Sequence, residues 1–583
     1  MLSEKNVTFT LTSPHLQRHF LLEGGRLETV AYHATGSQNS LISIPAKEGH
    51  ILLNKQTLTL GHGDLDGMPC TGCSSRDLEN GGQEVVFHFS GGPGVPEGLG
   101  VSVVYQAPGS SPVLLKWIRV SNESETSVLL DGIEVERVTP LVSGSHALLL
   151  ENDYVRDALT IDGQRAYSPW IEDHNRYISA FLNPRQADNR FAYPVSLDRH
   201  LLPRQTFSSF RAFEFLVPNG TEAERGIAFR MATRTLFPWT RKRSLSCKLA
   251  PARTIEDYYL GIDSAAEAGF EAVCLHHGWV DGYLTSPLFT NYCDYELRAE
   301  IFPKGWDDVR NLTDYAHGKG LQMSYYTIYV NTWRGGDWPD VLKRNDWELR
   351  WAEDDKSSRW GVTLDPATGW GSFVNRKIED SIVRGGFDAW HLDGPYYGDI
   401  CVAENRGYLP GGPNQPLAWD QQVEFYCRMR ARNIHGEAAQ GFQAMAHGMS
   451  RITTTGYNEG DFGEMAIWEQ ISSNRKAAYG FTRLYRPEAA VNWIPVMPWS
   501  HKADAPSLMP LEEHVEEYDA YLANVYGYGF EGAPFLRVAF DGPMSRAVVG
   551  RWLGFWKAHA DFFKLFFVND CHFNFFRSLA QFQ

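Results

Sequence analysis

An acidic residue follows an apolar run in the segment 386–399, GFDAWHLDGPYYGD, and this pattern predicts a buried strand that carries a carboxylate at its end. Trp390 and Leu392 are typical of a strand, and the Gly-Pro pair after Asp393 ends it. Apolar residues at helical spacing predict a helix over 370–384 just before it. An Asp-Gly pair alone is also typical of a turn or a helix N-cap. In barrels of alternating strands and helices, however, the carboxyl ends of the strands carry the chemistry, so Asp393 is the first candidate catalytic residue.

Helix and strand patterns alternate from residue 254 to 565, and close to eight such pairs predict a (β/α)8 TIM barrel. Thr254 is a candidate N-cap for its first helix, and 270–279 is its first predicted strand. Residues 1–240 contain short strand-like runs separated by Gly, Pro, Asn and Asp, which predict an antiparallel β-sandwich. The expected fold class is therefore a multidomain β and α/β protein. A linker is expected over 241–253 and a tail over 566–583.

The composition limits the possible functions. Of the 583 residues 43% are hydrophobic and 13% aromatic, which is enough for large cores. Because 54 Lys and Arg face 70 Asp and Glu, the net charge of −16 argues against nucleic acid or an anionic membrane as a partner. We see neither an N-terminal signal sequence nor a run of about 18 apolar residues, so the predicted location is cytoplasmic. Cys70 and Cys73 have no second ligand pair at zinc spacing.

Four histidines are candidate ligand-binding residues. His276 and His277 end the strand predicted over 270–279, His391 precedes Asp393 by two residues, and His447 follows a later predicted strand. A neutral imidazole both donates and accepts hydrogen bonds, which suits sugar hydroxyl groups. Together with Asp393, the histidines could instead hold zinc or iron. None has the spacing of an HExxH motif, so hydrogen bonding to a ligand is the preferred interpretation and no metal is predicted.

Aromatic residues near the same strand ends are candidates for walls against which a sugar ring stacks. They are Trp279, Tyr325, Tyr326, Trp390, Tyr396, Tyr397, Trp493 and Trp499. We expect about half of them to serve core packing instead. Trp279 and Tyr396 are preferred, because they follow strands whose ends should face the site.

Three ordered motifs resemble one enzyme family. The segment AAEAGFEAVCLHHGW resembles the first barrel strand of that family, which reads ELFVLDDGWF after a helix end. The segment FPKGWDDVRNLTDYAHGKGLQMSYY is similar to the family's FPNGLKPLADYVHSKGMKFGLW, and DAWHLD is similar to its DYIKWD. The family is that of the clan D glycoside hydrolases, in particular α-galactosidase family 36. The resemblance implies a sandwich followed by a barrel, with Asp393 as the nucleophile. It places the general acid/base after the sixth strand, where the candidates are Glu459, Asp461 and Glu464 and Asp461 is preferred.

The chain departs from the family pattern at three positions. The paired acids of the first family strand are His276 and His277 here, and the Lys of KWD is His391. The resemblance implies a retaining exo-α-glycoside hydrolase that acts on α-galactosides or α-N-acetylgalactosaminides in an oligosaccharide or glycoconjugate, without a cofactor. Three alternatives stay open: a transglycosidase of the raffinose-synthase type, a metal-dependent hydrolase that uses the histidines, and a non-catalytic carbohydrate-binding protein.

Overall fold

The computed structural model forms two compact units. The first comprises Met1–Leu236 with the short segments Gly411–Pro416 and Ala446–Gly448, and the second comprises Phe237–Pro410, Leu417–Met445 and Met449–Gln583. The structure describes residues 6–61, 67–79, 81–109, 111–141, 146–154, 159–161, 164–165, 189–193, 196–218, 231–232, 235–241, 245–249, 252–280, 283–290, 292, 294–329, 331–332, 347, 362–393, 415–438, 455–458, 490–495, 512, 515–516, 519–520, 522–523, 531–536 and 542–566.

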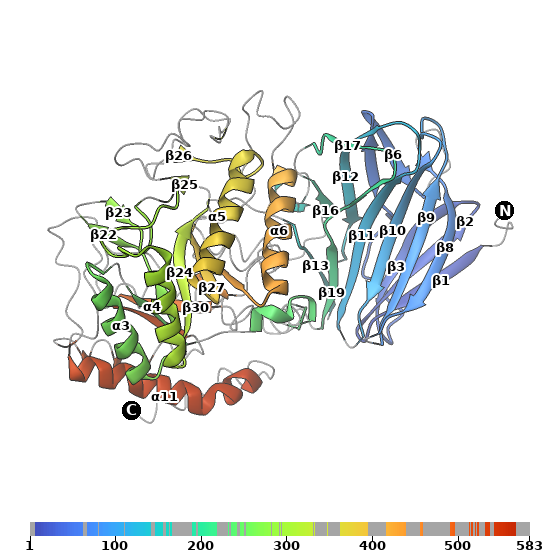
Figure 1. The fold of residues 1–583 in the computed structure, drawn as a ribbon. Helices are drawn as coiled ribbons and strands as arrows, with labels where there is room; N and C mark the ends of the chain where they lie inside the picture. Colours follow the sequence, from blue (N-terminus) through green and yellow to red (C-terminus); the bar gives the residue numbers. More distant parts are fainter. Residues whose placement is uncertain are drawn as a thin grey trace. The chain divides into compact units, whose positions relative to one another are not determined.

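The described part of the first unit consists of three β-sheets (Figure 1). One has the order β1 (Val7–Thr12), β2 (Leu16–Glu23), β3 (Arg26–Ala34), β4 (Ala46–Lys47). The second has the order β13 (His146–Asn152), β19 (Ala212–Pro218), β11 (Val113–Asn122), β10 (Leu99–Ala107), β9 (Gln83–Ser90), β8 (Cys70–Asp77), with β18 (Gln205–Ser208) on β11. The third has the order β15 (Gln164–Arg165), β14 (Leu159–Ile161), β16 (Asn189–Ala192), β12 (Val128–Val138), β5 (His50–Leu53), β6 (Gln56–Leu60), β7 (Gly67–Met68), with β17 (Arg199–Leu201) on β12.

Alternating side chains explain why these segments form layered sheets. In β10 the buried Leu99, Val101 and Val103 alternate with the more accessible Gly100 and Ser102 over the first part of the strand, as expected when one face covers a core. Neighbouring strands run antiparallel, apart from the short β6–β7 pair. The predicted β-sheet character of this unit is confirmed.

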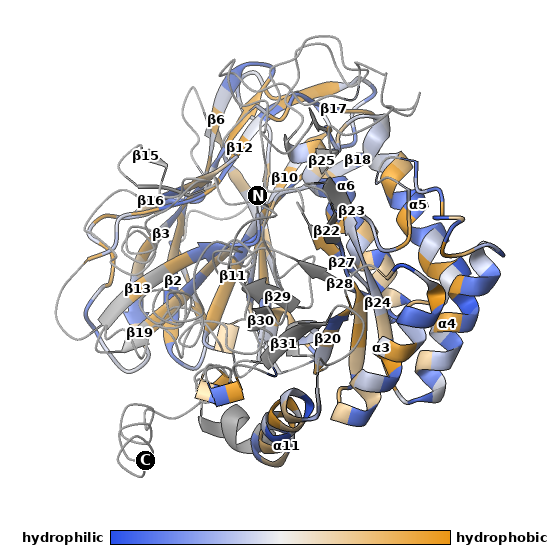
Figure 2. Cartoon of the chain, turned by 90° about the vertical axis from the view of Figure 1, so that its left-hand side faces the viewer, coloured by the Kyte–Doolittle hydropathy of each residue, from blue (hydrophilic) through white to orange (hydrophobic). Residues whose placement is uncertain are grey.

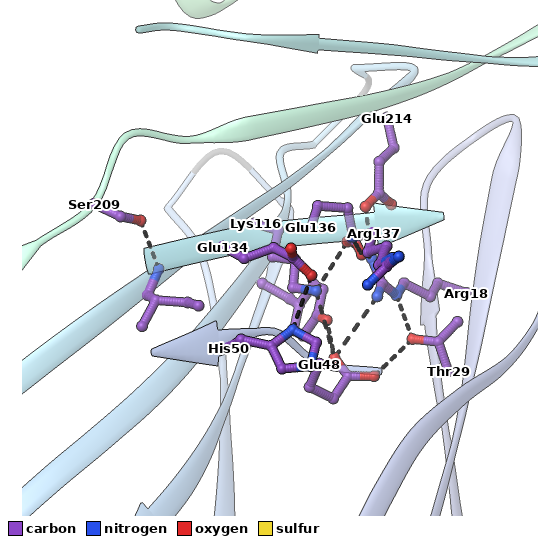
Figure 3. Close-up of polar contacts among 12 residues, drawn as sticks. Arg18, Thr29, Glu48, His50, Lys116, Glu134, Glu136, Arg137, Ser209 and Glu214 are labelled. Atoms are coloured by element: carbon purple, nitrogen blue, oxygen red, sulfur yellow. Dashed lines mark hydrogen bonds and ion pairs between the residues drawn. The ribbon is translucent and has the colours of Figure 1, made fainter. Parts of the chain in front are cut away.

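A group of buried charged residues joins the three sheets of this unit (Figure 3). We call it the sandwich ion cluster: Arg18 of β2, Glu48, Lys116 of β11, Glu136 of β12 and Glu214 of β19. The Arg18 Nη1 atom donates to Glu136 Oε2 at 2.7 Å and to Glu214 Oε1 at 2.6 Å. Lys116 Nζ lies 2.9 Å from Glu136 Oε2. Because its members come from all three sheets, the cluster fixes the positions of the sheets relative to one another.

The carboxyl groups of this cluster differ in their pKa. Burial raises the pKa of Glu214 far above its ordinary value, and the charge of Glu136 beside it adds to the shift. At Glu136 burial has the same tendency, but the charges of Arg18 and Lys116 overcome it and lower the pKa. Three carboxyl groups thus lie near two cations, and the raised pKa of Glu214 favours its protonated form.

In the second unit, eight parallel strands close into a barrel. In order they are β20 (Ser246–Leu249), β21 (Ala272–Leu275), β24 (Gln322–Ile328), β27 (Ala389–Asp393), β28 (His435–Ala438), β29 (Thr455–Asn458), β30 (Ala490–Pro495) and β31 (Glu531–Leu536). Pairing of β31 with β20 closes the ring. Two short antiparallel strand pairs accompany it, β22 (Gly278–Val280) with β23 (Tyr283–Thr285) and β25 (Asn331–Thr332) with β26 (Val362–Thr363).

The helices described for this unit alternate with the strands (Figure 1). They are α3 (Ile255–Ala268), α4 (Trp306–Gly318), α5 (Gly369–Gly385), α6 (Gln415–Ala431) and α11 (Pro543–Phe566), with a short 3-10 turn η1 (Pro238–Arg241). Thr254 caps α3 in a reciprocal hydrogen-bonded pair with Asp257, and Gly269 ends the helix in a left-handed conformation, with φ of 92°. Figure 2 shows α4 with its hydrophobic side toward the strands, where Val309 and Leu312 are buried. The predicted α/β character is confirmed.

Two strands were missed. The predicted linker 241–253 is wrong in part, because it contains β20, so the strand expected to be first, 270–279, is the second and ends at Leu275. The fifth strand, β28, also escaped prediction. Both are four residues long and include a charged or glycine residue, so neither has the apolar run or alternation that indicates a strand. Among the helices that the structure describes, none is both long and apolar enough to cross a membrane.

Candidate active site

The fourth barrel strand places Asp393 and His391 at one end of the barrel. Gly386 has a left-handed φ of 77° and ends α5, so the chain can leave the helix and continue into β27. Phe387, Trp390 and Leu392, which follow, are buried. Asp393 is the last residue of this strand and pairs in register with Ile328 of β24, while His391 pairs with Tyr326. Alternate residues of a strand share a face, so the positions of His391 and Asp393 lie on the same face of the sheet.

His276 enters the same layer from the second strand. It follows directly after β21, and its backbone N–H donates to Leu249 O at 2.7 Å, which continues the pairing with β20. The ring centroid of His276 lies 5.1 Å from that of His391, 4.3 Å from that of His277 and 4.6 Å from that of Tyr326. Tyr326 also contacts His277, at 4.2 Å between centroids. Barrel closure therefore brings His276, His277 and His391 together.

Lys248 of β20 completes this group, and its Nζ atom donates to His391 Nδ1 at 3.4 Å. We call Lys248, His276, His277, Tyr326 and His391 the barrel-end cluster; all five side chains are buried. An ammonium group has no acceptor, so Nδ1 of His391 must be unprotonated in this contact. A neutral His391 then carries its ring proton on Nε2.

The histidines of the cluster influence one another electrostatically. Burial is the main cause that holds the pKa of His276 well below its ordinary value, and the basic groups of His277, His391 and Lys248 around it act in the same direction. His276 is therefore a neutral imidazole at neutral pH. The described side chains of the cluster thus bring an ammonium donor and imidazole nitrogens together in the barrel.

Several predicted site residues lie, as a whole or with their side chains, outside the described part of the chain. Trp279 is in β22, where it pairs with Leu284 of β23. The residues Tyr396, His447, Glu459, Asp461 and Glu464 lie outside the described residues. Asn458, which precedes the candidate acids, is the last residue of the sixth strand, β29, and pairs in register with Asn492.

Three of the candidate aromatic residues have side chains that the structure describes: Tyr325, Tyr326 and Trp390. Tyr325 packs against Phe387 at 4.8 Å between centroids, and Trp390 packs against Tyr426 at 5.0 Å, so both serve helix and strand packing. Tyr326, in contrast, belongs to the barrel-end cluster. Tyr326 pairs in register with His391. Knowledge of this strand alignment would have identified Tyr326 as a residue of the cluster.

Sequence reasoning missed two residues near this end of the barrel. Lys248 was assigned to a linker, and the short strand that carries it has no clear pattern. Glu437 of β28 is the register partner of His391, so its position is in the same row. Neither has a local motif; only strand pairing identifies them.

A metal site finds no support among the residues that can be described. Within this part of the chain, no three His, Cys, Asp or Glu side chains are arranged to hold a metal ion. His447 and the side chain of Asp393 lie outside the description. The histidines that are described contact one another, Tyr326 and Lys248.

Several solved α-galactosidase structures are similar to this chain. The α-galactosidase from Lactobacillus brevis matches with a TM-score of 0.64 and 13% identity, over 97% of this chain and 85% of that one. The family 36 α-galactosidase AgaA from Geobacillus stearothermophilus matches with a TM-score of 0.64 and 12% identity, over 95% and 86%. The galactosidase domain of the α-galactosidase–sucrose kinase AgaSK has a TM-score of 0.62 at 12% identity, over 96% and 87%. The chain has the fold of these α-galactosidases. The likeness expected from the three motifs is thereby confirmed at the level of fold.

Comparisons by sequence give less. No protein-family model matches the chain. Human myelin-associated glycoprotein is 39% identical over 77 residues, which are 13% of this chain. The chain spans 12% of the length of that curated relative.

Proposed function

We propose that this protein is a retaining exo-α-glycoside hydrolase whose catalytic domain is the second unit. One observation carries the proposal: Asp393 ends the fourth strand of a closed parallel barrel, at the end where such barrels place their catalytic residues. The shared fold with α-galactosidases supports it. We infer α-galactosides or α-N-acetylgalactosaminides as the substrate class, from the resemblance of the motifs.

In the proposed first step, the Asp393 carboxylate attacks the anomeric carbon while a second carboxyl group protonates the departing glycosidic oxygen. The C–O bond to the leaving group breaks as the bond to Asp393 forms. The second group, now ionised, removes a proton from water, and that water displaces Asp393 and releases the sugar. The configuration at the anomeric carbon is inverted twice and hence retained.

We assign the second carboxyl group to Asp461, with Glu459 and Glu464 as alternatives. All three follow the sixth strand, which lies two strands from β27 in the barrel. Adjacent strands are about 4.8 Å apart, so the two strands are roughly 10 Å apart. Side chains from both can approach across the rim to the separation of about 5–5.5 Å that a retaining mechanism needs.

The proposal is tested with 4-nitrophenyl α- and β-glycosides, assayed with the wild type, Asp393→Ala and Asp393→Asn. We expect each variant to lose at least about a thousandfold in kcat, since the nucleophile is absent. Added azide should restore turnover of one α-glycoside by Asp393→Ala and give a glycosyl azide of inverted configuration.

Asp388→Asn is the matched control, because Asp388 precedes the same strand at its opposite end. Its Oδ2 atom accepts from Met323 N–H at 2.8 Å and lies 2.9 Å from His317 Nε2. This variant should keep its activity. An Asp393→Ala protein as active as the wild type, or no turnover of any α-glycoside by the wild type, would reject the proposed mechanism.

Product analysis separates hydrolysis from transfer. A hydrolase releases the free sugar, whereas a transglycosidase of the raffinose-synthase type moves it to an added acceptor sugar through the same glycosyl-enzyme. Binding of the sugar without turnover would instead indicate a carbohydrate-binding protein. Lost activity after chelation, with recovery on adding metal, would favour the metal-dependent alternative.

A further inference from the structure

Two histidines lie side by side on one sheet of the first unit. His19 of β2 and His33 of β3 have ring centroids 4.6 Å apart, with 50° between the ring planes. Both side chains are partly exposed, and along their strands they alternate with buried residues such as Arg18 and Tyr32. Alternate residues of a strand point to opposite faces of the sheet. The two imidazoles therefore lie on the face turned away from the sandwich ion cluster, at the surface of the unit.

The two nitrogens of His19 have different surroundings. Nδ1 lies 2.9 Å from the hydroxyl oxygen of Thr10, on the neighbouring strand β1. Nε2 has no contact with solvent, and no group of the described residues forms a hydrogen bond with it. A polar atom in this position costs free energy unless water or an ion binds it. Nε2 of His19 is thus an unpaired ligand atom next to a second imidazole.

His19 also has the protonation state that a metal ligand needs. Burial is the main cause that lowers the pKa of His19 below its ordinary value, and the neighbouring His33 acts in the same direction. His19 is therefore neutral at neutral pH. When its Nδ1–H donates to the Thr10 hydroxyl, the lone pair of the ring is on Nε2. Metal-binding histidines commonly have this arrangement, in which the second ring nitrogen donates a hydrogen bond.

The distance between the two rings fits a shared cation. With metal–nitrogen bonds of about 2.0–2.1 Å, two imidazoles on one tetrahedral or square-planar cation have ring centroids roughly 4.5–5.2 Å apart. The observed separation of 4.6 Å lies within this range. Rotation about the last side-chain bond of a histidine is soft, so the partly exposed ring of His33 can direct a nitrogen to the point that Nε2 of His19 faces.

We propose that His19 and His33 bind a first-row transition-metal cation, with water molecules as the remaining ligands. Imidazole suits Cu²⁺, Ni²⁺ and Zn²⁺, and of these Cu²⁺ binds most tightly. Among the residues that the structure describes, no third His, Cys, Asp or Glu joins the pair. The site therefore keeps open positions, unlike a closed structural site. A bound cation would join β2 to β3, and its binding does not depend on the proposed reaction at Asp393.

Calorimetric titration of the full chain with Cu²⁺ at neutral pH tests the inference, together with electron paramagnetic resonance of samples that contain less than one equivalent of Cu²⁺. We expect the tightest-bound Cu²⁺ of the wild type to show two nitrogen ligands. His19→Ala and His33→Ala should each bind this equivalent at least about tenfold more weakly. Mg²⁺, which prefers oxygen ligands, should not bind here.

His88→Ala is the matched control in the same unit. Nδ1 of His88 lies 3.2 Å from the Ser102 hydroxyl, and Nε2 lies 3.4 Å from the Ser74 hydroxyl, so both nitrogens already have polar partners. This variant should bind Cu²⁺ as the wild type does. Thr10→Val keeps both imidazoles and removes the hydrogen bond to Nδ1, so it should weaken binding by roughly tenfold.

Two results would overturn the inference. One is a titration that is the same for the wild type, His19→Ala and His33→Ala, because the tightest Cu²⁺ would then be bound by other residues. The other is a wild-type resonance spectrum with fewer than two nitrogen ligands. The spectrum is recorded on the unaltered protein, so it does not depend on how well the variants fold.

Discussion

Arg18 in the first unit and Lys248 in the second are both fully buried cations, yet their surroundings differ. Arg18 donates to the carboxyl groups of Glu136 and Glu214, and both of these acids come from strands of other sheets. Lys248 donates to an imidazole at the end of parallel strands. A cation held by fixed carboxylates already has its charge compensated and serves the architecture. Lys248 instead lies among the histidines of the barrel-end cluster, in the barrel whose fourth strand carries the proposed nucleophile.

The largest expected effect tests the structural role of Arg18. Arg18→Met should lower the stability of the first unit by about 3–5 kcal/mol, because buried carboxylates lose their main cation. Hydrogen exchange of β2 and β11 peptides in increasing urea measures this for that unit alone. The control Arg26→Met removes an arginine that is 58% exposed and pairs with Glu28, so it should change stability by less than about 0.5 kcal/mol. A loss below about 1 kcal/mol for Arg18→Met would contradict the assignment.

The dependence of stability on pH tests the protonation of Glu214 in the same cluster. The pKa of Glu214 is raised in the folded state, so between its ordinary value and the raised one the folded protein holds a proton that the unfolded chain has lost. The stability contributed by this proton is present at low pH and decreases as pH rises, by up to about 1.4 kcal/mol per pH unit. Glu214→Gln should flatten this decrease in the first unit.

Glu151 also makes the stability decrease as pH rises, since burial raises its pKa to about 8. The difference between wild type and Glu214→Gln isolates the cluster. Glu23→Gln, at an exposed position, should leave the slope unchanged. Equal slopes for wild type and Glu214→Gln would show that Glu214 is ionised in the folded protein.

The smallest effect concerns the barrel-end cluster. Lys248→Met removes one positive charge near His276, so the pKa of His276 should rise. It should stay below its ordinary value, because burial is the larger cause. NMR titration of the His276 ring in both proteins measures the change, with Lys319→Met, at an exposed lysine of the same unit, as the control that should not move it. An unchanged pKa would show that Lys248 is neutral or screened from His276.

Local elements of both units could be predicted because their information is local. Thr254, Asp257 and Gly269 mark the ends of α3 by hydrogen-bonding and backbone preferences that act over a few residues. The apolar run before Asp393 likewise predicted β27. The short strand that carries Lys248 has no such pattern, because barrel pairing rather than its own residues makes it a strand.

The sequence by itself determined that a β-rich unit precedes an α/β unit and that Asp393 ends a strand, since periodicity, caps and turns depend on near neighbours. Only the tertiary structure decided which side chains meet. Lys248 and His391 are 143 residues apart, and Arg18 and Glu214 are 196 apart. Such contacts follow from barrel closure and sheet stacking, which are set by the burial of all strands together and not by any one segment.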